Sequence, residues 1–129
     1  MKKQILIVDD IEGIRRELTF LLEDENYTVF QAEDGLKAIK ILTHENIDLV
    51  ISDILMPNMD GLELCIYLEK NHPSISIILI SGGGNTYKKD KNATDDLLSQ
   101  AQMLTRAKAV LKKPFTTEEL ITQVKKVFQ

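Results

Sequence analysis

The amino-acid sequence predicts an α/β fold: a doubly wound sheet of five parallel strands, with five helices on its two faces. Short runs rich in β-branched residues alternate with segments of helical periodicity, which is the pattern of repeated strand–helix–strand units. The strand runs are apolar throughout, as expected of a parallel sheet that is covered on both faces. We therefore expect a parallel sheet with right-handed crossovers and a site at the point where the strand order reverses.

Five apolar runs are predicted to form the strands. They span residues 4–8, 27–31, 47–52, 75–80 and 107–112. Parallel neighbours in a sheet need a crossover connection, usually a helix, and each gap between these runs is long enough to hold one.

Five segments with apolar residues three or four positions apart are predicted to form the helices. The apolar stripes of the first three helices are Ile14, Leu18, Leu21 and Leu22; Leu36, Ile39 and Leu42; and Leu62, Cys65, Ile66 and Leu68. Those of the last two are Leu97, Leu98, Ala101 and Leu104, and Leu120, Ile121, Val124 and Val127. Asp60 and Thr116 precede the third and fifth helices, and both residue types are favoured N-caps.

Length and composition narrow the class of protein. The 129 residues fit a single domain spanning 1–129, and the net charge of −4 argues against general affinity for nucleic acid or for an anionic membrane. The lone cysteine, Cys65, excludes an internal disulfide and suits a reducing compartment. The apolar runs are too short to span a bilayer. We expect a cytoplasmic protein.

Polar residues stand where the predicted strands end. Asp9 and Asp10 follow the first strand, Asp53 the third, Ser81 the fourth and Lys113 the fifth. The carboxyl ends of parallel strands share one edge of the sheet, and ligands bind there, where the strand order reverses. The sequence therefore predicts a site built from these five side chains.

The residue types at this edge indicate phosphoryl transfer assisted by a metal ion. Three clustered carboxylates repel one another unless a hard cation lies between them, and Mg²⁺ prefers oxygen ligands of this kind. A carboxylate beside that ion can act as the nucleophile and form an acyl phosphate. Lys113 can supply a fixed positive charge and Ser81 a hydroxyl donor to the phosphoryl oxygens.

Four segments together resemble the receiver domain of response regulators, the phosphate-accepting module of two-component signalling. They are residues 7–10 (IVDD), 53–61 (DILMPNMDG), 81–82 (SG) and 111–115 (LKKPF), within a resemblance that runs from residue 5 to 127. Each segment alone is a weak signal, whereas the four in this order are highly specific.

The resemblance implies a flavodoxin-like sheet with strand order 2-1-3-4-5, and a role for each site residue. Asp53 is the phospho-acceptor, Asp10 binds Mg²⁺ directly, and Asp9 binds it directly or through water. The backbone carbonyl of Leu55 is a further metal ligand. Ser81 and Lys113 contact the phosphoryl group, and the peptide bond between Lys113 and Pro114 is cis.

The resemblance also implies partners. A histidine kinase or a phosphotransfer protein donates the phosphoryl group, and the chain is a signalling domain, not an enzyme acting on an external substrate. The signal leaves through the face formed by the fourth helix, the fifth strand and the fifth helix, which is also the candidate surface for a homodimer. The sequence does not identify the output partner.

Two features depart from the family's usual pattern. Val110 stands where an aromatic ring usually reports activation, and Val is stiff and has no polar tip. The connection after the fourth strand is longer than usual, and residues 82–92 begin with three glycines, Gly82 to Gly84. Because glycine loses the most conformational freedom on ordering, we expect phosphorylation to order 82–92 in place of a ring movement.

Two other functions compete with the phosphorylated switch. A pseudo-receiver would keep the fold and bind partners without phosphorylation; Val110 and the long connection favour it mildly, and the complete set of acids opposes it. A Mg²⁺-dependent phosphatase would need a second acid two residues after Asp53, where Leu55 stands. His44 and His72 have no second ligand nearby in the sequence, so neither is expected to bind a metal.

Overall fold

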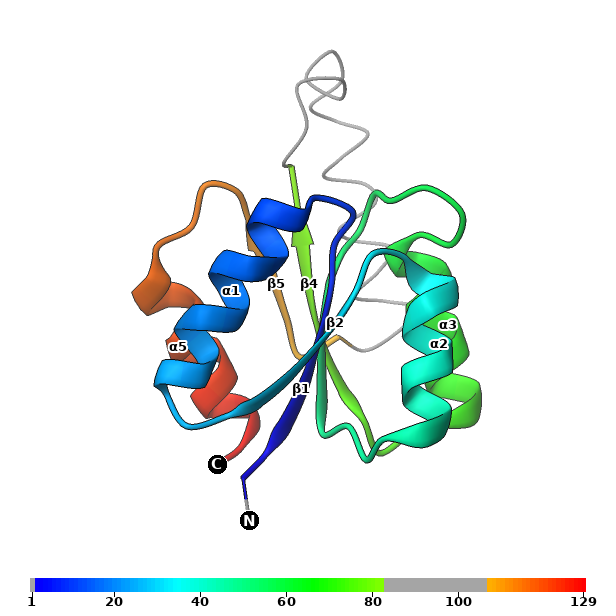
Figure 1. Cartoon of the computed structure of the whole chain (residues 1–129), viewed down its shortest axis with the longest axis horizontal. Coiled ribbons are helices and arrows are strands. Elements are labelled where there is room, and N and C mark those ends of the chain that lie inside the picture. The colour runs from blue at the N-terminus through cyan, green and yellow to red at the C-terminus, as the bar shows by residue number, and fades with distance from the viewer. Residues whose placement is uncertain (1, 83–106) are drawn as a thin grey trace.

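The computed structural model in Figure 1 describes residues 2–82 and 107–129. Its centre is a five-stranded parallel sheet with the order β2-β1-β3-β4-β5, which confirms the predicted fold class. The strands are β1 (Gln4–Val8), β2 (Thr28–Ala32), β3 (Leu49–Asp53), β4 (Ser76–Ser81) and β5 (Ala109–Lys112).

Within residues 2–82 and 107–129, four helices cover the two faces of the sheet. They are α1 (Glu12–Asp24), α2 (Gly35–His44), α3 (Gly61–Asn71) and α5 (Thr117–Val127). The helices α1 and α5 lie on one face and α2 and α3 on the other (Figure 1). The predicted fourth helix and residues 83–92 of the predicted extended segment lie outside the described residues. Among the described residues, no helix has the length and apolar character needed to cross a lipid bilayer.

The sheet separates two apolar cores. Alternate strand residues such as Leu6 and Val50 pack under α2 and α3, while Ile7 and Ile51 pack under α1 and α5. All four side chains are fully buried. Burying such a side chain stabilises a fold by about 1.5–3 kcal/mol. Burial on both faces explains why the strand segments carry no polar alternation.

One predicted inward-facing residue is wrong. Ile66 was predicted on the buried stripe of the third helix, but it is 41% exposed, whereas Leu64 is fully buried. The helix begins at the Asp60 cap, and the 3.6-residue repeat then places Gly61, Leu64 and Leu68 on one line facing the sheet. Ile66 is about half a turn away from that line.

The predicted helix caps are confirmed. Asp60 accepts a hydrogen bond from the Glu63 N–H at 2.9 Å, and Thr116 accepts one from the Glu119 N–H at 3.0 Å. In both helices the glutamate also reaches back to the backbone N–H of the cap. Such a cap contributes about 1 kcal/mol. Each one fixes where the helix starts relative to the site residues that precede it.

Candidate functional site

The predicted acids meet at the carboxyl edge of the sheet. The strands β1 and β3 are parallel neighbours, with Val8 paired to Ser52, so the residues that follow them come close. Asp9, Asp10 and Asp53 each place a carboxylate oxygen within 4.8 Å of the others. Asp9 and Asp53 are buried, at 1% and 8% exposed, while Asp10 is open to solvent.

Lys113 brings a positive charge to the buried pair. Its backbone N–H donates to the carbonyl of Ser81 at 2.9 Å, which places the residue just beyond β5. Its Nζ lies 3.9 Å from Oδ2 of Asp9 and 3.9 Å from Oδ2 of Asp53. The peptide bond to Pro114 is cis, as the resemblance implied. One ammonium is therefore within ion-pair distance of both buried carboxylates.

Several polar atoms of this cluster lack a hydrogen bond within the described part of the chain. They are Oδ2 of Asp9, Oγ of Ser81 and Nζ of Lys113. A separation of 3.9 Å is an ion pair but too long for a hydrogen bond. Buried polar atoms are nearly always paired in native proteins, so three unpaired atoms around one point indicate a place for a polar ligand.

Burial is the main electrostatic cost at this site. It raises the pKa of Asp53 to about 6; the nearby Lys113 opposes this rise, and Asp9 and Asp10 add to it by like-charge repulsion. Burial also raises the pKa of Asp9, against a hydrogen bond from the Ile11 N–H at 2.9 Å. The cluster holds its negative charge at a cost that a cation would relieve.

These residues fit a magnesium ion. Three oxygen donors converge, one of them with an unpaired buried oxygen, and their combined charge exceeds that of the single ammonium. Mg²⁺ takes one or two carboxylates and keeps several waters, which the exposed side at Asp10 can admit. Leu55, predicted to offer its carbonyl, lies two residues beyond Asp53, and its backbone N–H lowers the pKa of that acid by hydrogen bonding.

Gly61, the last residue of the segment 53–61, also shapes the site, a role that was not predicted. Its N–H donates to the Ile54 carbonyl at 2.7 Å, so α3 begins directly against the backbone that follows Asp53. A Cβ at this position would lie 2.8 Å from the Ile54 Cα and still closer to the Asp53 carbonyl oxygen. Only glycine permits this approach. The glycine after the Asp60 cap was the available signal.

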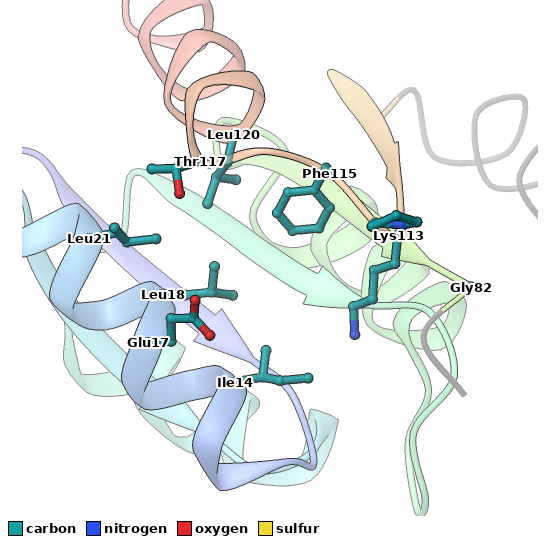
Figure 2. Close-up of a pocket in the computed structure, with 10 residues that line it drawn as sticks. Ile14, Glu17, Leu18, Leu21, Gly82, Lys113, Phe115, Thr117 and Leu120 are labelled. Carbon is teal, nitrogen blue, oxygen red and sulfur yellow. The ribbon is translucent and has the colours of Figure 1, made fainter. Parts of the chain in front are cut away.

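A groove opens beside the cluster. It has a volume of about 500 Å³ and runs between α1 and the segment that joins β5 to α5. Figure 2 shows Ile14 and Leu18 of α1 facing Phe115 and Leu120 across it, with Lys113 at one end. The groove is mainly apolar, and its charged end lies next to the acids.

Val110 lies in the middle of β5, opposite Leu79 of β4. It is half-buried and packs against the core under α2 and α3. The position that an aromatic ring would occupy is therefore part of the packed sheet, with a short aliphatic side chain.

A sequence profile of the response regulator receiver domain matches residues 5–125. The chain belongs to the response regulator receiver family. This confirms the resemblance seen in the sequence. The receiver is 35% identical to sporulation initiation phosphotransferase F of Bacillus subtilis, over 98% of this chain and 94% of that protein. It is 34% identical to the sensor kinase CckA of Brucella abortus, over 97% of this chain but 12% of that protein.

The curated relatives therefore differ in length. This receiver spans nearly all of the phosphotransferase, half of the regulatory protein ResD of Bacillus subtilis, and a small part of the sensor kinase. Sequence similarity to the longer proteins concerns their receiver parts.

Solved structures give the same family. The signal receiver domain of an HD domain-containing protein from Pseudomonas fluorescens Pf-5 has a TM-score of 0.87 and 30% identity, covering 99% of this chain and 95% of that chain. The response regulator TrrA of Thermotoga maritima, solved in complex with Mg²⁺-BeF, has a TM-score of 0.77 and 34% identity, covering 97% and 98%.

Proposed function

We propose that this receiver accepts a phosphoryl group on Asp53 in a Mg²⁺-dependent reaction, and that the phosphorylated form binds its partners differently from the resting form. The observation that carries the proposal is the convergence of three carboxylates within 4.8 Å, with Nζ of Lys113 at 3.9 Å from both buried acids. Such a set suits the charge changes of phosphoryl transfer.

In the reaction, a carboxylate oxygen of Asp53 attacks the phosphorus atom of the donor. The bond between phosphorus and the donor's leaving atom breaks, and the leaving group departs with the electron pair. Asp10, Asp53 and the Leu55 carbonyl would hold Mg²⁺, with Asp9 binding it directly or through water, and the ion would supply positive charge beside the phosphoryl oxygens.

Residues of the chain itself would bind the phosphoryl oxygens and supply the nucleophile. Neither the ammonium of Lys113 nor the hydroxyl of Ser81 makes a hydrogen bond to the described residues, so the first can bind one phosphoryl oxygen and the second can donate to another. Asp53 must be ionised to attack, and its pKa of about 6 without a metal would fall when a cation binds. The buried position of Asp53 also keeps bulk water from the acyl phosphate.

The donor in this proposal is a histidine kinase or a phosphotransfer protein, and the setting is the cytoplasm. A relative named as a phosphotransferase and another named as a sensor kinase support it. The output surface in this proposal is formed by β5, α5 and the predicted fourth helix, whose residues lie outside the described ones, and this surface could also pair two receivers. The receiver is not proposed to turn over an external substrate, since Leu55 stands where a phosphatase of this type would carry its second acid.

Intact-mass spectrometry tests the proposal directly. Wild type incubated with acetyl phosphate and Mg²⁺ should gain one phosphoryl group, and Asp53→Asn should gain none. Asp24→Asn, which changes an exposed acid at the end of α1, is the matched control and should react like wild type. Unchanged phosphate uptake in Asp53→Asn would refute the assignment. No uptake by wild type, from acetyl phosphate or from a phosphorylated phosphotransfer protein, would favour the pseudo-receiver.

A further inference from the structure

A second polar contact joins two loops at the carboxyl edge of the sheet. The side chain of Asn58 donates from Nδ2 to Oδ2 of Asp34 at 2.9 Å. The neighbouring residues are also in contact, because the Gly35 N–H donates to the Met59 carbonyl at 3.3 Å. We call this pair of contacts, between residues 34–35 and 58–59, the loop latch.

The loop latch connects strands that are not neighbours. Asp34 follows β2 and caps α2, while Asn58 lies in the loop 54–60, between β3 and α3. In the sheet, β2 and β3 flank β1, whose carboxyl end carries Asp9 and Asp10. The latch therefore ties the loop that follows Asp53 to the far side of the strand that supplies the other two acids.

The latch holds the loop in a conformation that its residues do not favour by themselves. Asn58 has φ = 67°, a left-handed backbone conformation that few residues other than glycine adopt, although asparagine tolerates it. Met59 covers Gly35 so closely that a Cβ on that glycine would lie 2.5 Å from the Met59 Cγ. A tertiary contact, and not local preference alone, fixes this part of the loop.

The Asp34 carboxylate is well placed to make a strong contact. It is 6% exposed, and its other oxygen accepts the Lys37 N–H at 2.9 Å as the cap of α2. Hydrogen bonds from the Lys37 N–H and from Asn58 hold the pKa of Asp34 below its usual value. The carboxylate is therefore ionised at neutral pH, and hydrogen bonds to a charged acceptor are the stronger kind.

We propose that Asp34 and Asn58 are positioning residues, which set the loop 54–60 so that Asp53 and the Leu55 carbonyl can bind the cation together. The inference rests on the proposed Mg²⁺ site. Mg²⁺ requires near-octahedral geometry at short distances. If the loop were flexible, the cost of ordering it would weaken Mg²⁺ binding. Neither Asp34 nor Asn58 touches the cation in this proposal.

The main test measures Mg²⁺ affinity by titration in the absence of any phosphodonor. Asn58→Gly removes the side-chain contact without straining the positive φ, and it also gives the loop more conformational freedom to lose on ordering. We expect its dissociation constant for Mg²⁺ to rise about tenfold, the lower end of what outer partners of metal ligands contribute. An unchanged constant in Asn58→Gly would overturn the proposal.

A charge-swap series separates positioning from a general loss of stability. Asn58→Asp is nearly isosteric but sets two carboxylates against each other, so its Mg²⁺ affinity should fall at least as far as in Asn58→Gly. Adding Asp34→Asn to it restores a donor opposite an acceptor and keeps the α2 cap, since asparagine also caps helices. The double variant should recover most of the affinity. A double variant that binds no better than Asn58→Asp would contradict the latch.

Asp48→Ala is the matched control. Its carboxylate accepts the Gln4 N–H at 2.8 Å, a comparable bond at the opposite edge of the sheet. Asp48→Ala should lower the melting temperature without changing the Mg²⁺ dissociation constant. A higher dissociation constant in this variant would show that the assay reports stability alone, and it would overturn the positioning role. Failure of wild type to bind Mg²⁺ would instead remove the proposed function on which the inference rests.

Discussion

The two edges of the sheet are built in opposite ways. At the amino edge, polar groups are paired: the Gln4 N–H donates to Asp48 at 2.8 Å, and the Thr28 N–H donates to the Lys3 carbonyl at 3.0 Å. Aromatic contacts reinforce this edge, where the Tyr27 and Phe128 rings lie 5.5 Å apart and the Lys3 ammonium is 5.6 Å from the Phe128 ring. Figure 1 shows that both ends of the chain meet there.

The carboxyl edge of the sheet, in contrast, holds several features that are unfavourable for stability. Buried acids lie together, three polar atoms are unpaired within the described residues, and Asn58 has a positive φ. Buried charges and unpaired polar groups lower the free energy of unfolding. The fold therefore draws its stability from the two cores and the amino edge. This stability allows polar groups at the carboxyl edge to remain without hydrogen-bond partners until a ligand binds.

The largest effect should come from closing the space beside Asp53. Gly61→Ala places a methyl group against backbone atoms of Asp53 and Ile54, which cannot move aside as a flexible side chain could. We expect a loss of about 2–3 kcal/mol in the free energy of unfolding, as for overpacked sites, together with impaired phosphorylation. Urea denaturation and acetyl phosphate labelling measure both.

Gly13→Ala is the control for Gly61→Ala. Nothing lies within 4 Å of a Cβ at Gly13, which is in the first turn of α1. Alanine should therefore leave stability unchanged or raise it, by up to about 1 kcal/mol. Equal losses in the two variants would mean that close approach at Gly61 is not what the glycine provides.

An effect of similar size, but of opposite sign, is expected from removing the charge at Asp53. In the metal-free receiver its pKa is raised from 3.8 to about 6, so between these values the folded state binds more protons than the unfolded state. The free energy of unfolding should therefore fall as pH rises from about 4 to about 6. Above pH 6, Asp53→Asn should be more stable than wild type by up to about 3 kcal/mol.

Denaturant titrations from pH 4 to 8 in the presence of a chelator measure this effect. Asp24→Asn removes an exposed acid and should keep the wild-type pH dependence. Adding Mg²⁺ should stabilise wild type more than Asp53→Asn, because binding to the native state alone adds to its stability. An Asp53→Asn variant that is no more stable than wild type at pH 7 would argue that the cluster is not electrostatically costly.

The smallest effect should follow from weakening the amino edge. Phe128→Ala removes the ring that contacts Tyr27 and Lys3, and because the ring is half-buried we expect a loss of about 1.5 kcal/mol. Mg²⁺ affinity and phosphate uptake should be unchanged, since the site lies at the other edge. A change in Mg²⁺ affinity in Phe128→Ala would show that the two edges are coupled and would weaken the comparison.

The architecture of the sheet and the grouping of the candidate site residues could be predicted from the sequence alone. Apolar runs and helical stripes are local patterns, so they predict the strands and helices, although the strand ends differ by one or two residues, as with the predicted 47–52 and the observed Leu49–Asp53. Parallel order then sends the residues after each strand to one edge, and for this reason Asp9, Asp53 and Lys113 could be grouped before the structure was known.

The interactions among those residues could not be predicted from the sequence, because they depend on the tertiary structure. The approach of Gly61 to Asp53 and the contact between Asp34 and Asn58 both depend on where separate segments cross. The raised pKa of Asp53 likewise follows from burial and from neighbours distant in the sequence. Local periodicity records which side of an element is buried against the sheet, but distances between loops are set by the packing of the whole fold.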